Sequence, residues 1–301
     1  MKRIVLTAAF VALGLASAFA ADLPSRTYAK APAAAAPAYN WSGWYGGLNA
    51  GWVGGSGRVS NDASIVSTST APVNAEAMAL GATNTAGTSS GFIGGGQFGY
   101  NYQFSHLFVA GFEADIQGLS GAHKRSSSAI PLLDGQSEGE GNIASVVTNS
   151  TTTRDLSYLG TLRARIGVLA VPSFLLYATG GLAYGGVKSD TTIAQSVTNT
   201  DRPPPATLTS GSFSGTRVGY VVGGGGEWML SSNWSAKLEY LYYDLGSATY
   251  VTGSLANNVR PTSLQGVDTA AIATFSKVRF NDNMVRVGVN YHFGDPAVSQ
   301  Y

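Results

Sequence analysis

Charged side chains stand at every second position within several apolar segments of this chain, and their chemistry sets what its interior can do. Nine such residues are Glu113, Asp115, Arg163, Arg165, Arg217, Glu227, Lys237, Glu239 and Arg286. Residues two apart on a β-strand share one face. Five basic and four acidic side chains would then point into the interior of one β-sheet structure. Such a group of charges is consistent with an ion-pair network or with a charged filter.

Two interpretations of these charges stay open. Counted from their shared turn, Glu113 and Arg165 are expected to come level as cross-strand neighbours, with Gln117 farther along. Unpaired buried charges are costly, so the structural interpretation is a paired network that fills the interior. The functional interpretation makes the same charges a narrow ion-conducting filter. Alternation alone does not separate the two.

Other motifs in the chain carry little chemistry. Gly94, Gly96 and Gly99 match the spacing of a dinucleotide fingerprint, but they lie in an alternating strand segment with no helix to follow. The stretch Gly87 to Gly91 matches a nucleophile elbow and also lacks its helix. We therefore expect neither a nucleotide site nor a hydrolase, and no enzyme of another class.

The three histidines do not form a metal site. His106, His123 and His292 lie far apart, without metal-ligand spacing. Cysteine is absent, which excludes thiolate ligands and thiol catalysis. His123 beside Lys124 and Arg125 leaves open contact with an anionic ligand such as haem, although a solvated loop is the stronger interpretation. We expect no metal and no resident cofactor.

Eight segments position the charges. In each of them large apolar residues recur at every second position, which is the periodicity of a strand with one apolar face. They run over Trp44 to Gly57, Gly91 to Phe104, His106 to Ser120, Asp155 to Ala170, Phe174 to Lys188, Thr216 to Leu230, Trp234 to Gly246 and Asn281 to Phe293. If the apolar face meets lipid, the charged face points inward.

The connections alternate between short and long. Three are tight, at Ser105, Val171 to Ser173 and Ser231 to Asn233. Four are long and polar, at Arg58 to Ser90, Gly121 to Arg154, Ser189 to Gly215 and Ser247 to Phe280. This alternation is typical of a transmembrane barrel with short periplasmic turns and longer external loops. The prediction is an all-β, eight-stranded, antiparallel up-and-down transmembrane β-barrel with four long extracellular loops.

Aromatic residues gather near the tight turns, where a girdle would meet lipid headgroups. The girdle is predicted to contain Tyr100, Tyr102, Phe104, Phe108, Trp228, Trp234, Tyr291 and Phe293, with Phe174 and Tyr177 beside the second turn.

The ends of the chain differ from its middle. Lys2 and Arg3, an apolar stretch and the small-x-small pattern ending at Ala20 describe a cleaved secretory signal over residues 1–20. Residues 21–40 are rich in Ala and Pro and indicate an extended periplasmic linker. The barrel is predicted over 41–294, with a short tail at 295–301. The formal charge of +1 favours no nucleic-acid partner.

Two stretches resemble a known family. Asn40 to Gly47 (NWSGWYGG) and Val285 to Gly294 (VRVGVNYHFG) are similar to the first and last strands of alphaproteobacterial outer-membrane immunogenic proteins, which are related to the opacity and OmpA-like barrels. The resemblance implies an outer-membrane location and insertion by the barrel-assembly machinery, which reads an aromatic final strand. In most members that strand closes the chain, whereas here eight residues follow Phe293.

The expected function follows from these features. We expect a non-enzymatic, surface-exposed envelope component in contact with membrane lipid and lipopolysaccharide. The resemblance also implies two alternatives, since some relatives are described as porins and others as haem binders. A narrow porin, or binding of a ligand or host surface through the loops, therefore remains open, as does the oligomeric state.

Overall fold

The computed structural model describes residues 39–65, 85–121, 123–134, 144–198, 207–259 and 268–293. The predicted signal, its cut after Ala20, nearly all of the linker and the C-terminal tail lie outside these residues. Among the described residues no helix is long and apolar enough to cross a membrane.

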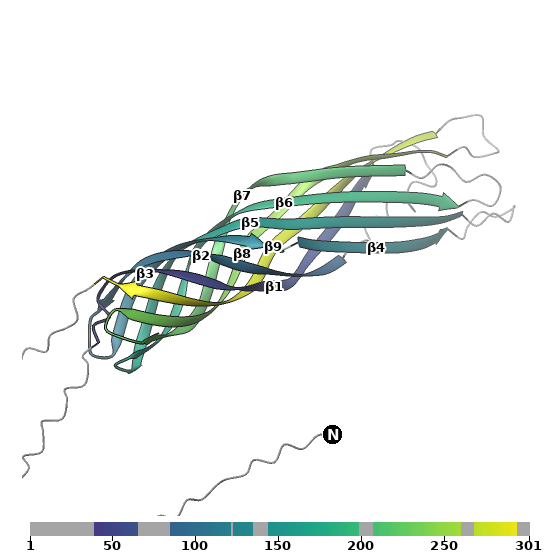
Figure 1. Ribbon diagram of the computed structural model, residues 1–301. Coiled ribbons are helices and arrows are strands. Elements are labelled where there is room, and N and C mark those ends of the chain that lie inside the picture. The colour runs from purple at the N-terminus through teal and green to yellow at the C-terminus, as the bar shows by residue number, and fades with distance from the viewer. Residues whose placement is uncertain are drawn as a thin grey trace, which may run out of the picture. The chain divides into compact units, whose positions relative to one another are not determined.

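Nine antiparallel strands make up the described part of the chain (Figure 1). They are β1 (Gly43–Ile65), β2 (Thr85–Gln103), β3 (Phe108–Ser120), β4 (His123–Asp134), β5 (Ala144–Val171), β6 (Phe174–Thr198), β7 (Thr207–Met229), β8 (Trp234–Val259) and β9 (Asp268–His292). The ladder order is β3-β2-β1-β9-β8-β7-β6-β5, and pairing of β3 with β5 closes an eight-stranded ring. This ring confirms the predicted fold class.

Along each strand of the ring, side chains point alternately to the inside and to the outside. On β5, for example, Thr161, Arg163 and Arg165 are buried inside while Leu162 and Ile166 are exposed outside. Because successive side chains point to opposite faces, the outer surface is apolar and the inner one polar or small. Gly94, Gly96 and Gly99 lie within β2, so no helix follows them as a dinucleotide site requires.

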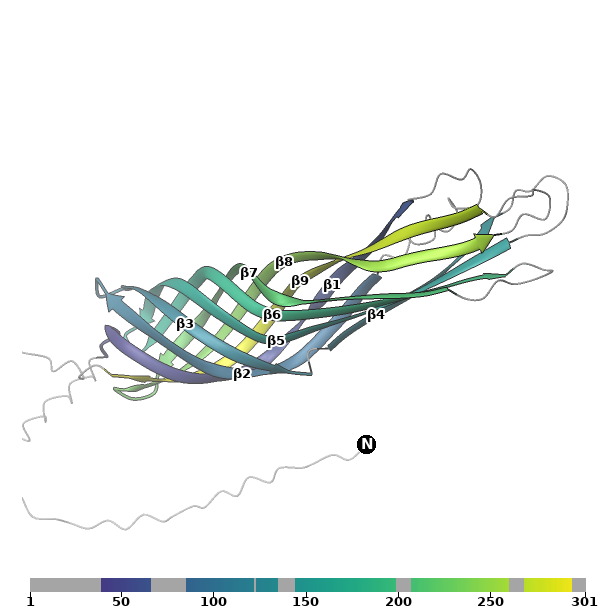
Figure 2. The ribbon, with the colours of Figure 1, turned by 90° about the horizontal axis from the view of Figure 1, so that it is seen from above.

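The strands extend farther than the sequence pattern predicts, which corrects the boundaries of all four long loops (Figure 2). The expected loop at Gly121 to Arg154 contains β4 and the start of β5. Threonine-rich runs such as Thr151 to Thr153 favour strands, but both of their faces are polar. The apolar alternation is therefore lost although the hydrogen-bonded ladder continues.

Beyond the ring the wall divides into two sheets. The β7–β8 ladder ends at Tyr220 and Asp244, while β8, β9 and β1 continue as one sheet and β4, β5, β6 and β7 as the other. Polar side chains join them: the Asn61 amide donates to the Ser150 hydroxyl at 2.8 Å. The Tyr250 hydroxyl lies 2.7 Å from that of Thr191. The extension is thus a two-sheet structure above the ring, in which polar side chains make contacts between the sheets.

Candidate functional site: the sealed interior of the barrel

Eight of the nine predicted charged residues meet in one buried network inside the ring. They come from β3 (Glu113, Asp115), β5 (Arg163, Arg165), β7 (Glu227), β8 (Lys237, Glu239) and β9 (Arg286). None is more than 5% exposed. Four acids face four bases, so the network is neutral when every group is ionised.

Arg163 is the centre of the network. Its guanidinium donates to Glu239 at 2.8 Å, to Asp115 at 2.9 Å and, by a shorter contact, to Glu113. Arg286 repeats this pattern from β9, because it donates to Glu239 at 2.6 Å and to Asp115 at 2.8 Å. Planar guanidinium groups with several fixed donors suit such shared recognition of carboxylates. The two arginines therefore connect β3, β5, β8 and β9 across the interior.

A second arm of the network lies nearer the short turns. Arg165 donates to Glu227 at 2.8 Å and lies 3.6 Å from Glu113. Its guanidinium is placed over the rings of Tyr45 and Tyr177, with its carbon 5.0 and 4.8 Å from the ring centroids. Both distances are within the range of cation–π attraction. Arg165 is therefore held by two aromatic rings as well as by carboxylates.

Two details of the sequence prediction are wrong. Arg217 faces inward but is not part of the network, because it lies higher on β7, donates to the Ser247 carbonyl at 2.7 Å and stacks on Phe213. The cross-strand partner of Glu113 is Arg163, whereas Arg165 lies opposite Gly111. β3 and β5 share no turn, because β4 lies between them in the chain, and counting from an assumed shared turn misplaces the register by two residues.

Tyr45 and Tyr177 are the contacts that the sequence prediction misses. Tyr177 was predicted to belong to the girdle, yet it is 5% exposed and its hydroxyl donates to Glu239 at 3.1 Å. A Cβ at Gly225 would lie 2.9 Å from that hydroxyl, and one at Gly99 would overlap the hydroxyl of Tyr45. The two glycines therefore make room for the rings. The sequence signal for these contacts is that each of the two glycines lies opposite an inward tyrosine on the neighbouring strand.

Amide side chains extend the network to the short-turn end. Asn49 donates to Gln97 at 2.9 Å, Gln97 to Asn290 at 2.5 Å, and Asn290 to Glu227 at 2.7 Å. Gln97 and Asn290 each donate and accept, so they connect Asn49 to Glu227 through side-chain hydrogen bonds. None of these residues was singled out from the sequence.

Apolar layers close the interior on both sides of the charges. Toward the short turns, Trp41 is fully buried with Val109, Leu169, Leu175 and Met229. Its indole N–H donates to the Pro172 carbonyl at 3.0 Å, and its ring meets His292 edge-on. The residues directly before β1 therefore fill the base of the barrel.

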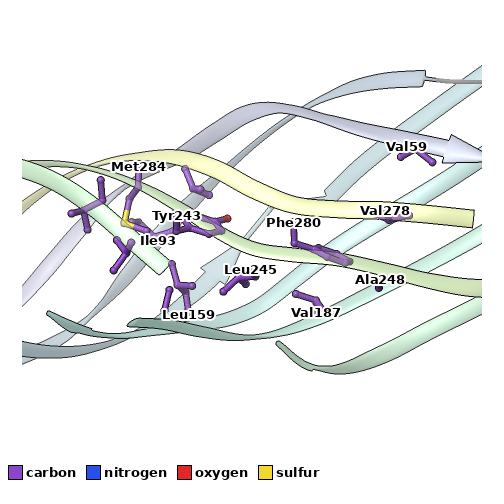
Figure 3. Packing of buried hydrophobic residues seen from close by; sticks show 14 of the residues in the cluster. Val59, Ile93, Leu159, Val187, Tyr243, Leu245, Ala248, Val278, Phe280 and Met284 are labelled. Atoms are coloured by element: carbon purple, nitrogen blue, oxygen red, sulfur yellow. The ribbon is translucent and has the colours of Figure 1, made fainter. Parts of the chain in front are cut away.

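The second apolar layer begins directly above the charges. Leu159 is two positions beyond Thr161, the partner of Asp115, and Leu241 is two positions beyond Glu239. Figure 3 shows this layer continuing along the axis, first through Ile93, Leu159, Tyr243 and Met284 and then through Val187, Ala248, Val278 and Phe280. Close-packed apolar side chains leave little space for water.

The outer face carries aromatic residues at two levels. Most of the predicted girdle residues are exposed there: Tyr102, Phe104, Phe108, Trp228, Trp234, Tyr291 and Phe293, with Tyr100 partly exposed. A second set lies toward the long-strand end and was not predicted: Trp52, Phe92, Tyr184, Tyr220 and Tyr240. Two such belts, one at each interface, frame the apolar band of a transmembrane barrel.

Metal-ligating side chains do not cluster within the described ranges. The side chains of His123, Lys124 and Arg125, proposed above as an anionic-ligand contact, lie outside what the structure describes, although their backbone forms part of β4.

Comparison with known proteins agrees with this architecture. A model of the outer membrane protein beta-barrel domain matches residues 6–293. The chain belongs to this outer-membrane β-barrel family. It is 33% identical over 293 residues to the 31 kDa outer-membrane immunogenic protein of Brucella melitensis, covering 97% of this chain and 100% of that one.

Two further relatives are more distant. The 22 kDa outer membrane protein of Rhizobium leguminosarum is 31% identical over 176 residues, which is 55% of this chain and 63% of that protein. The crystal structure of the outer membrane protein OprG from Pseudomonas aeruginosa is 14% identical with a TM-score of 0.36, covering 86% of this chain and all of that one. The family model and the Brucella melitensis protein show that this chain is an outer-membrane protein.

Proposed function

We propose that this protein is a closed, non-conducting barrel that acts as a structural and surface-displayed component of the outer membrane. The observation that carries the proposal is the order of layers along the interior: Trp41 at the base, a neutral ion-pair network, then the apolar layer that begins at Leu159 and Leu241. A pore that conducts ions needs a continuous wet path, and an apolar constriction opposes wetting.

The charges then have a structural role. Each basic side chain reaches at least one carboxylate from another strand, so the network connects walls that are far apart in sequence. Buried ion pairs contribute little net stability over apolar packing, but they make alternative registers costly because a shifted strand leaves charges unpaired. The network thus supports one strand register.

The same interior speaks against enzymatic chemistry. Ser235 lies 3.0 Å from Nε2 of His292 and donates to Glu227 at 2.6 Å, which resembles a nucleophile with its base and acid. In a catalytic triad the acid orients the base from its other ring nitrogen. Here Glu227 binds the serine itself, and the group is buried beneath Trp41. We therefore assign it a packing role.

Planar-bilayer recordings test the proposal. The folded protein should show no discrete conductance steps, and Trp41→Gly alone should stay silent because the upper apolar layer remains. Trp41→Gly combined with Leu159→Gly and Leu241→Gly should also stay silent, because Ile93, Tyr243 and Met284 of the upper layer remain. Heat-modifiable gel mobility verifies that each variant is folded. Steps from the unaltered protein that change on Glu113→Gln would instead assign it a pore.

A further inference from the structure

The outer face of β9 changes its chemistry along the strand. Starting from the short-turn end, its outward residues are Val289, Val287 and Val285, then Asn283 and Asn281, and finally Arg279 and Lys277. The residues between them point inside; Val278 and Phe280, on either side of Arg279, belong to the inner apolar layer (Figure 3). The strand thus presents aliphatic, amide and cationic groups to its surroundings in that order.

The cations stand beyond the apolar band of the barrel. At about 3.3 Å per residue, Arg279 lies roughly 40 Å along β9 from Tyr291 of the aromatic belt near the short turns. A strand tilt of about 40° reduces this to roughly 30 Å along the membrane normal, whereas the apolar band is about 25 Å tall. The ladder also places Asn281 beside Asp244, and Asp244 beside Tyr220 of the second belt. Arg279 therefore lies at the level of lipid headgroups.

A β-bulge in β8 fixes the guanidinium of Arg279. Within the bulge Gly246 has a φ of +76°, which favours glycine, and its N–H donates to the Asp244 carboxylate at 2.8 Å. The same carboxylate accepts from Nε of Arg279 at 3.1 Å and, by a shorter contact, from Nη2. Asp244 is buried, whereas the Arg279 side chain is 55% exposed. The guanidinium is thus held on the outer face by a buried anion.

This pair of cations has unused capacity for an anion. The bonds to Asp244 use two of the five guanidinium N–H groups of Arg279, which leaves three for an outside acceptor. Lys277 is exposed two positions farther along the same face and adds an ammonium group. Asp244 balances one of the two positive charges, so an excess of one remains. Guanidinium and ammonium groups both suit phosphate oxygens.

The comparison with Lys188 shows that the excess is local. Among the side chains that the structure describes, Lys188 on β6 is the other exposed cation of the outer face. Asp155 lies directly opposite it, and Asp190 is exposed two residues farther along β6. The acids outnumber the base there. An anion is therefore attracted to Lys277 and Arg279, and not to Lys188.

An apolar groove continues the same face below the cations. It has a volume of about 690 Å³ and extends over β9 and its neighbours, where Val287, Val289, Ala236, Leu48 and Trp228 line it. Such a surface suits a hydrocarbon chain. A ligand that combines an anionic head with acyl chains therefore matches both parts of this face, whereas a free anion matches only one.

We propose that Lys277 and Arg279 bind the phosphate group of a membrane lipid, whose acyl chains lie along Val285, Val287 and the groove below. With the short turns toward the periplasm, as the sequence predicts, this end of the barrel meets the outer leaflet. The lipid is then lipopolysaccharide, which carries phosphate groups on its acylated anchor. The site is on the outer face, so a conducting interior would leave the proposal unaffected.

Native mass spectrometry of the full mature protein, folded in detergent micelles, tests the proposal. The probe is lipid A, the phosphorylated anchor of lipopolysaccharide, and the reference is lipid A from which the phosphates have been removed. The protein should retain lipid A and should bind the dephosphorylated form much more weakly. Inorganic phosphate at the same concentration should not displace lipid A, since it makes no contact with the groove.

Matched lysine variants locate the site. Lys277→Gln should weaken lipid A binding about fivefold, and Lys277→Gln with Arg279→Gln about 25-fold. The single variant keeps the Arg279–Asp244 pair, so its effect does not depend on the stability of the bulge. Lys188→Gln is the control and should leave binding unchanged. Heat-modifiable mobility verifies folding. Equal retention of the two lipids, equal loss in Lys188→Gln, or displacement by inorganic phosphate would each overturn the proposal.

Discussion

Lys237 donates to both carboxylate oxygens of Glu113, each at 2.8 Å, although the two residues are 124 positions apart in the chain. Lys237 lies on β8 and Glu113 on β3, so the contact spans the interior from wall to wall. Glu113 thus accepts hydrogen bonds from the Lys237 ammonium group as well as from arginine side chains.

Lys237→Met tests the strength of this contact. The variant leaves Glu113 buried with one cation fewer, and loss of one partner of a buried pair costs about 3–5 kcal/mol. Urea unfolding in lipid vesicles should show a decrease of that size in the free energy of unfolding. Lys188→Met, an exposed lysine on β6, is the control and should change little. If Glu113→Gln lowers the free energy of unfolding as much in the Lys237→Met variant as in the unaltered protein, the direct coupling is absent.

Tryptophan fluorescence tests the position of Trp41. The chain has five tryptophans; four of them are exposed on the outer face, namely Trp44, Trp52, Trp228 and Trp234. Variants that keep one tryptophan each, with Phe at the other positions, should divide into two classes. Brominated lipids should quench the four outward residues and leave Trp41 bright, because it is enclosed at the base. Lipid quenching of Trp41 would contradict the closed base.

Gly225→Ala tests the packing beneath Tyr177. A Cβ there would overlap the Leu238 carbonyl and crowd the Tyr177 hydroxyl. Overpacking of this kind costs about 1–3 kcal/mol, which equilibrium unfolding should detect. Gly94→Ala on the lipid-facing side of β2 is the matched control, since its Cβ would come no closer than 3.6 Å to another atom. Equal stabilities of the two variants would show that the interior has spare room at Gly225.

Tyr250→Phe tests the two-sheet extension above the ring. The change removes hydroxyl contacts with Ser189 at 2.9 Å and Thr191 at 2.7 Å. Each lost hydrogen bond is worth about 1 kcal/mol, so amide exchange should accelerate in the upper parts of β6 and β8. Exchange within the ring should stay unchanged. Tyr220→Phe, which alters an outward tyrosine, should have no such effect; a similar acceleration there would mean that the extension is not held by Tyr250.

The sequence predicts the ring well because two-residue alternation and short turns are local signals. Strand pairs such as Trp228 opposite Ala236 follow directly from a tight turn. The inward face of the charges also follows, since strand parity places Glu113, Arg163 and Glu239 on the side opposite the large apolar residues. The fold class is therefore available from patterns that span only a few residues.

Other features depend on the closed structure and leave no local signal. The register of β3 against β5 cannot be counted through the inserted β4, so Arg165 was paired with Glu113 in place of Arg163. Tyr177 is different, because its position between the outward residues Leu176 and Ala178 already places it inside, and only its aromatic type suggests the girdle. The upper strands lack a regular apolar alternation because their buried residues mix Ser and Thr with apolar side chains such as Val187 and Val278.

The distribution of the network among the strands has a consequence for assembly. β3 carries two acids and β5 two bases, so these neighbours cancel each other. One acid on β7, an acid and a base on β8, and one base on β9 cancel only when all three strands are present. The eight-residue network is therefore neutral after β5 and becomes neutral again only when β9 is added. The second half of the barrel should enter the membrane as one cooperative unit.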